Sequence, residues 1–196
     1  MTLLVLGLVL FIGIHSFSMA RGPRATLIGT IGEGAYKGLY SLLSLAGIVL
    51  ISVGYGQYRA NGYIPVWDPP VWTRHLALLL VLVAFICFVA AYLPGHIKAQ
   101  LKHPMLAGVK IWAFAHLISN GDLGSILLFG AFLAWAVVAR ISLKRRDVAA
   151  QHGGTAAPAG WRNDILAVAI GTVVYLAFVF WLHPWLIGVS VLPTRA

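Results

Sequence analysis

Acidic residues and cysteine are scarce in this sequence. Only 5 of its 196 residues are Asp or Glu, and charged residues make up 10% of the chain, against about 25% in a soluble domain. The single cysteine, Cys87, excludes an intramolecular disulfide and a metal cluster built from cysteines. The chain also lacks a Walker loop, a GxGxxG fingerprint, an HExxH pair and a GxSxG elbow. These absences exclude an ordinary soluble domain and leave hydrolytic chemistry without support.

Apolar residues dominate the chain instead. They make up 60% of the sequence, and the mean hydropathy is +0.89. Because a membrane-spanning helix needs about 20 apolar residues, we predict an all-α, polytopic membrane helix bundle with about six transmembrane helices in one domain, residues 1–196. The predicted spans are about residues 2–20, 38–58, 75–93, 104–119, 123–139 and 165–189. The short runs 104–119 and 123–139 are alternatively a tight hairpin buried among the other helices.

Basic residues outnumber acidic ones, 14 to 5, which gives a formal charge of +9. They lie between the apolar runs, so we interpret them as topology signals and anchors for anionic lipid, with no nucleic-acid partner. One side carries Arg21, Arg24, Lys37, Lys98, Lys102, Arg140, Lys144, Arg145, Arg146 and Arg162, and the other only Arg59, Arg74 and Arg195. The positive-inside rule then predicts that both termini are periplasmic and that the protein is multi-pass in a bacterial inner (cytoplasmic) membrane.

Several connections between the runs carry recognisable turn signals. Residues 61–72, with three prolines and two tryptophans, predict a turn-rich interfacial segment, and residues 147–162 predict a flexible cytoplasmic linker. Residues 29–38 are rich in glycine and predict a flexible turn in which Glu33 is a pairing carboxylate. Asp122 is expected to cap the helix that follows it, and the His103-Pro104 and His183-Pro184 pairs to begin or kink helices.

Ionisable residues within the spans are the candidates for function, because the bilayer penalises them. His15 precedes Arg21 by six residues, which places it about 9 Å below the expected cytoplasmic edge. It is either an interhelical hydrogen-bonding group or a ligand of a metal or haem. Lys110 either snorkels to the cytoplasmic side, pairs with Glu33, or meets an anionic ligand such as a haem propionate.

His116 lies deeper, about 18 Å from the same edge. Trp112 shares its helical face and offers a flat apolar wall, and Ala113 leaves space beside the imidazole. This face suits a planar cofactor, although small residues at such spacing also serve close helix packing. Haem or redox chemistry needs only two histidines and an apolar slot, and the sequence supplies both.

A family resemblance rests on residues 103–116, on Asn120-Gly-Asp-Leu, on Phe132-Leu-Ala-Trp135 and on residues 140–146. With His15-Ser16 and Arg74-His75, these segments resemble the NnrU family. The resemblance implies a multi-helix membrane protein associated with denitrification and nitric oxide metabolism in bacteria. The family is similar to the zeta-carotene isomerases, which are haem b enzymes.

Carried over residue by residue, the resemblance implies that His15 and His116 are the axial ligands of haem b. The isomerases have a cysteine where this chain has Ala113, and a histidine where it has Trp135, so a Cys–His ligand exchange is not expected. Trp112 would wall the pocket, and Lys110 or Arg21 would meet the propionates. The function would be a redox, isomerase-like or nitric-oxide-linked reaction.

Two other functions remain open from the sequence. One is a non-enzymatic membrane factor for the assembly or regulation of nitrogen-oxide reductases, in which both histidines only pack helices and reductase components are the partners. The other is a small membrane methyltransferase, because Lys102-His103-Pro104 resembles a segment of isoprenylcysteine and phospholipid methyltransferases. That resemblance implies an S-adenosylmethionine pocket on the cytoplasmic side.

Overall fold

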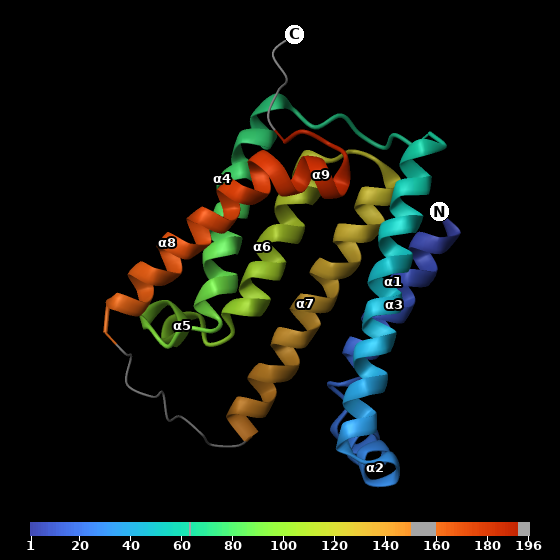
Figure 1. The fold of residues 1–196 in the computed structure, drawn as a ribbon, viewed down its shortest axis with the longest axis vertical. Helices are drawn as coiled ribbons and strands as arrows, with labels where there is room; N and C mark the ends of the chain where they lie inside the picture. The colour runs from blue at the N-terminus through green and yellow to red at the C-terminus, as the bar shows by residue number, and fades with distance from the viewer. Residues whose placement is uncertain (63, 150–159, 192–196) are drawn as a thin grey trace. The chain divides into compact units, whose positions relative to one another are not determined.

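The structure, a computed structural model, describes residues 1–62, 64–149 and 160–191 (Figure 1). Every regular element in these ranges is a helix, which confirms the all-α prediction. In chain order they are α1 (Thr2–Phe17), α2 (Arg21–Ile31), α3 (Glu33–Ala60), α4 (Val71–Ala90), α5 (His96–Leu101), α6 (Pro104–Ser119), α7 (Leu123–Ala149), α8 (Arg162–Ala177), the π-helical turn η1 (Phe178–Leu182) and α9 (His183–Ile187). Of the predicted linker, residues 150–159 lie outside the described residues, while α7 runs to Ala149 and α8 begins at Arg162.

The helices divide into two compact units. Unit 1 consists of residues 1–69 and 120–146 and holds α1, α2, α3 and most of α7. Unit 2 consists of residues 70–119 and the described residues from 147 on, and holds α4, α5, α6, α8, η1 and α9. The two histidines that the sequence singles out therefore belong to different units, His15 to unit 1 and His116 to unit 2.

Within unit 1, glycines let α1 and α3 approach closely as an antiparallel pair. A Cβ on Gly7 would lie 2.6 Å from the Ile51 backbone nitrogen, and one on Gly47 would lie 2.9 Å from the Phe11 Cβ. A Cβ on Gly54 would meet the backbone around Leu4, which is fully buried. Such small-residue contacts let helices gain van der Waals packing where lipid provides no hydrophobic drive. They also fix the register that places the end of α1 beside the start of α3.

The start of α7 is held by its own cap and by residues 61–69. The Asp122 carboxylate accepts hydrogen bonds from the Ser125 backbone N–H (2.9 Å) and the Ser125 hydroxyl (2.6 Å), which confirms the predicted cap. The Gly121 carbonyl accepts from the backbone N–H groups of Val66 (2.8 Å) and Trp67 (3.1 Å). Trp67 is 42% exposed, as expected of an interfacial side chain.

Within unit 2, α4 packs against both α6 and α8 (Figure 1). A Cβ on Gly171 of α8 would lie 2.8 Å from the Ile86 Cα of α4, so glycine again permits the close approach. The two histidine–proline pairs act as predicted, since α6 begins at Pro104 and α9 begins at His183 after the π-helical turn.

Within the described residues, four helical segments are long and apolar enough to cross a membrane: Glu33–Ala60, Val71–Ala90, Leu123–Arg146 and Arg162–Ile187. A fifth results if α1 and α2, which meet at 89°, are counted as one bent span, and α6 is a shorter apolar helix. The count of six and the periplasmic termini stay predictions. The flexible turn predicted at residues 29–38 is wrong. Helix covers this segment except at Gly32, whose φ of +83° breaks it, because glycine tolerates this backbone conformation.

Candidate functional site

His15 occupies an aromatic environment within unit 1. Its ring stacks on that of Phe11, one turn earlier in α1, with centroids 4.1 Å apart. The Tyr40 ring of α3 lies 5.2 Å away, and the Trp135 ring of α7 meets it edge-on at 5.7 Å. Three helices of unit 1 thus contribute to the surroundings of one imidazole. Nothing in the sequence identifies the Tyr40 and Trp135 rings as neighbours of His15, because they come from distant positions in the chain.

The hydrogen bond of His15 determines which ring nitrogen carries the proton. Nδ1 lies 2.7 Å from the Phe11 carbonyl oxygen. A carbonyl oxygen only accepts hydrogen bonds, so Nδ1 is the protonated nitrogen and the neutral ring has its lone pair on Nε2. Metal-binding histidines show this arrangement, in which one nitrogen donates to a carbonyl and the other faces the metal.

His116 has the same arrangement in unit 2. Its Nδ1 lies 2.8 Å from the Trp112 carbonyl oxygen, again one turn earlier in the same helix. The lone pair is therefore on Nε2 here as well. The Trp112 ring lies 5.2 Å from the imidazole, centroid to centroid, at an angle of 51°. The structure thus brings two of the predicted residues together. On the same helix, Ala113 is fully buried.

A cavity of about 500 Å³ in unit 1 shares Tyr40 with the surroundings of His15. It is lined by Ser18, Arg24, Tyr36, Lys37, Tyr40 and Ser41, which come from the end of α1, from α2 and from α3. Tyr40 belongs to both places, since it lines the cavity and lies beside the His15 ring. The Ser18 hydroxyl donates to the His15 carbonyl oxygen at 2.6 Å. Tyr40 and Ser18 thus link the cavity lining to the surroundings of His15.

The remaining predicted residues are placed as follows. Arg21 is the exposed first residue of α2, and of the two arginines in this helix Arg24 is the one that lines the cavity. Lys110 is partly exposed on α6. Glu33 is a pairing carboxylate, as predicted, but its partner is Lys37, whose Nζ lies 2.8 Å from Oε1. The alternative pairing of Glu33 with Lys110, which belongs to unit 2, stays a prediction.

Sequence analysis missed Arg24, Tyr36 and Tyr40 as site residues. Tyr36 and Tyr40 are one turn apart on α3, so their shared face is visible in the sequence, but nothing there shows what that face meets. The decisive feature is the 89° bend between α1 and α2, which brings the Arg24 guanidinium over the Tyr36 ring, 5.6 Å from its centroid.

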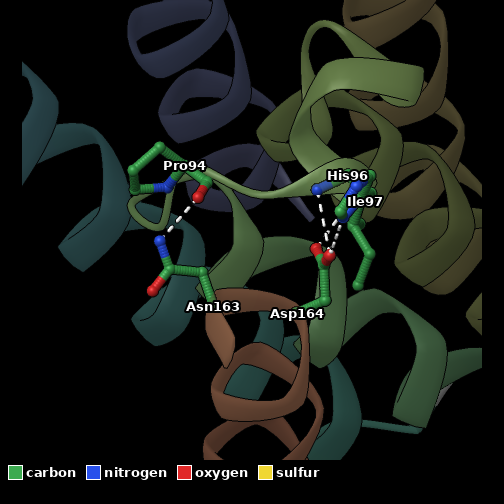
Figure 2. Close-up of polar contacts among 5 residues, drawn as sticks. All are labelled: Pro94, His96, Ile97, Asn163 and Asp164. Carbon is green, nitrogen blue, oxygen red and sulfur yellow. Dashed lines mark hydrogen bonds and ion pairs between the residues drawn. The ribbon is translucent and has the colours of Figure 1, made fainter. Parts of the chain in front are cut away.

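A second polar cluster joins α5 to α8 within unit 2 (Figure 2). The Asp164 carboxylate accepts from the backbone N–H groups of His96 and Ile97, both at 3.0 Å, and from His96 Nδ1 at 2.7 Å. Nearby, the Asn163 side-chain amide donates to the Pro94 carbonyl oxygen at 2.6 Å. Because the carboxylate caps the short helix α5 and is buried, we assign this cluster a structural role.

Comparison with protein families assigns the chain to a family. The family model described as NnrU protein matches residues 3–191, nearly the whole chain. A search of curated proteins finds no match, and neither does a search of solved structures. Among the described residues, no group of three or more His, Cys, Asp or Glu side chains is arranged to hold a metal ion.

Proposed function

The chain belongs to the NnrU family, and from this premise we propose that it is a membrane protein that binds haem b, with His15 and His116 as the axial ligands. The proposed setting is the bacterial inner membrane, where the haem would serve nitric-oxide-linked or other redox metabolism. The lipid bilayer is its environment, in agreement with the long apolar helices.

One observation carries the proposal. Both imidazoles donate through Nδ1 to the carbonyl four residues earlier, at 2.7 Å for His15 and 2.8 Å for His116. In the neutral ring the proton is therefore on Nδ1 and the lone pair on Nε2, and each imidazole is oriented by a backbone acceptor. This combination is what haem iron requires of a histidine ligand and its supporting group.

The surroundings of His15 also fit a bound aromatic macrocycle. Phe11, Tyr40 and Trp135 provide flat apolar surfaces within ring-contact distance. The buried Trp135 Nε1 has no acceptor among the described residues, and a buried donor of this kind is costly unless a bound group satisfies it. In unit 2, Trp112 supplies the corresponding wall for His116. Lys110 and Arg21 remain the proposed partners of the propionates.

Two histidine ligands would restrict the reactions that the haem iron can carry out. A haem contributes one-electron redox chemistry when bound, and two imidazoles fill both axial positions of its iron. Ala113, which is fully buried, offers no sulfur for an exchange of ligands. We therefore favour electron transfer over an isomerase-like reaction. The residues of this chain would bind and orient the iron and exclude water from it.

The test is the haem content of the purified full-length protein, measured as the pyridine haemochrome after expression in haem-replete cells. His15→Ala and His116→Ala are each expected to lose most of the haem. His183→Ala is the matched control, because His183 also donates through Nδ1 to a carbonyl, that of Val189 at 2.9 Å, yet is not a proposed ligand. Far-UV circular dichroism establishes that each variant remains helical.

The contrary results are equally specific. A colourless wild-type protein, or full haem in both variants, would contradict the proposal. In that case the histidines only pack helices, and a non-enzymatic factor for nitrogen-oxide reductases becomes the better account. Loss of haem in His183→Ala with retention in His15→Ala would replace one ligand by another. Saturable binding of S-adenosylmethionine by the colourless protein would instead support a methyltransferase.

A further inference from the structure

The cavity between α2 and α3 has the composition of an anion site. Arg24 and Lys37 provide positive charge, and Ser18, Tyr36, Tyr40 and Ser41 provide hydroxyl groups that donate hydrogen bonds. The cavity thus combines two cations with several hydroxyl groups, of which that of Ser18 already donates to the His15 carbonyl oxygen, and the volume of about 500 Å³ is that of a small-ligand pocket.

One residue that lines the cavity has a buried hydroxyl without a hydrogen-bond partner. Tyr36 is 5% exposed, and its hydroxyl has no hydrogen-bond partner within the parts of the chain that the structure describes. Leaving a buried hydroxyl unpaired is unfavourable. The Arg24 guanidinium lies over the face of the Tyr36 ring. The ring thus helps to position the cation, while the Tyr36 hydroxyl has no hydrogen-bond acceptor.

The charges specify a monoanion. Lys37 is already paired with Glu33 at 2.8 Å, and both of these side chains are about two-thirds exposed, at 69% and 66%. Among the described residues, Arg24 forms no ion pair with a carboxylate, so Arg24, Lys37 and Glu33 together leave one net positive charge at the cavity. One net positive charge is matched by a phosphodiester, which carries a single negative charge, and not by a phosphomonoester, which carries up to two.

The position of the cavity indicates the source of the phosphate. Helix α2 has no buried residue, turns by 89° from α1, and carries Arg21 and Arg24 on the side where the positive-inside rule predicts the cytoplasm. Short helices with basic residues at this level meet the anionic headgroups of the inner leaflet. We propose that this cavity binds the phosphate group of an anionic phospholipid such as phosphatidylglycerol, an activity that goes beyond the proposed haem function.

The experiment measures lipid binding by the purified full-length protein with native mass spectrometry. Phosphatidylglycerol and phosphatidylcholine are added in separate titrations, and inorganic phosphate in a third. The wild type is expected to prefer phosphatidylglycerol, because phosphatidylcholine brings a cation of its own, and to bind inorganic phosphate more weakly than either lipid because it has no acyl chains. Binding of inorganic phosphate as tight as that of phosphatidylglycerol would assign the site to the free ion and overturn the lipid proposal.

Three variants separate the cavity from general attraction to a basic surface. Arg24→Gln removes a charged hydrogen bond and is expected to weaken phosphatidylglycerol binding about tenfold or more. Tyr36→Phe removes only the unpaired hydroxyl and is expected to weaken it about three- to fivefold. Arg145→Gln, the control, removes the same charge from an exposed arginine of the same unit that does not line the cavity, and should bind as the wild type does. Equal losses in Arg24→Gln and Arg145→Gln would contradict the proposal.

A parallel set in a His15→Ala, His116→Ala background keeps this inference apart from the haem proposal. Lipid preference that survives in the haem-free background supports the cavity as a lipid site whatever the outcome for haem. A cavity that instead holds a haem carboxylate predicts a different result. Arg24→Gln would then lose haem, and phosphatidylglycerol binding would not depend on Arg24, which overturns the lipid proposal.

Discussion

Replacing Gly54 with alanine tests whether the close contact of α1 and α3 holds unit 1 together. A Cβ at this position would lie 2.6 Å from the Leu3 carbonyl carbon and 2.7 Å from the Leu4 Cα, and these backbone atoms cannot move aside as a flexible side chain does. Overpacking of a tight interface costs about 1–3 kcal/mol, with a backbone clash at the upper end. The higher helix propensity of alanine relative to glycine offsets about 0.8–1.0 kcal/mol of this cost. We therefore expect a net destabilisation of about 2 kcal/mol.

Gly56→Ala is the matched control, because a Cβ on Gly56 meets nothing within 4 Å. It gains the same propensity without the clash, so it should leave stability unchanged or raise it by up to about 1 kcal/mol. Thermal unfolding in one detergent, followed by far-UV circular dichroism, measures the difference. At roughly 2–4 °C per kcal/mol for a chain of this length, Gly54→Ala should lower Tm by roughly 4–8 °C. Equal Tm values for the two variants would refute the packing argument.

Two further predictions concern the polar clusters. Asp122→Ala removes the cap of α7 and should lower the free energy of unfolding by about 0.5–2 kcal/mol. Asp122→Asn should retain most of the stabilisation, because asparagine also caps helices. Thermal unfolding checks this, and an Ala variant as stable as the wild type would contradict it. Asp164→Asn replaces one acceptor oxygen by a donor beside the N–H groups of His96 and Ile97. Hydrogen exchange at these two amides should therefore become faster than in the wild type, by a larger factor than at the amides of α4. Unchanged exchange there would show that the carboxylate is not the cap of α5.

The sequence predicts the features that depend on local signals. Apolar runs locate the helices, and α6 covers the predicted range 104–119 as expected, because Pro104 favours the first turn of a helix and ends the preceding segment. The cap at Asp122 is likewise local, since its partner Ser125 is three residues away. These features are decided within one or two turns of chain.

The features that the sequence does not predict depend on contacts between distant residues. The Asp164 carboxylate meets backbone groups 67 and 68 residues earlier, and no pattern around Asp164 indicates them. The glycine-rich segment at 29–38 was misjudged because glycine content predicts turns, whereas only Gly32 has the positive φ that breaks a helix. The cavity follows from the bend between α1 and α2, so its Arg24–Tyr36 contact was equally hidden.

The central claim is that His15 and His116 are the two axial ligands of one haem. Electron paramagnetic resonance of the oxidised, full-length protein tests it most directly, because the signal reports the axial ligands of the iron. The account predicts a low-spin signal characteristic of two imidazole ligands in the wild type, converted to a high-spin signal or lost in His15→Ala and in His116→Ala. A high-spin signal in the wild type, or a low-spin signal that survives both substitutions, would contradict it.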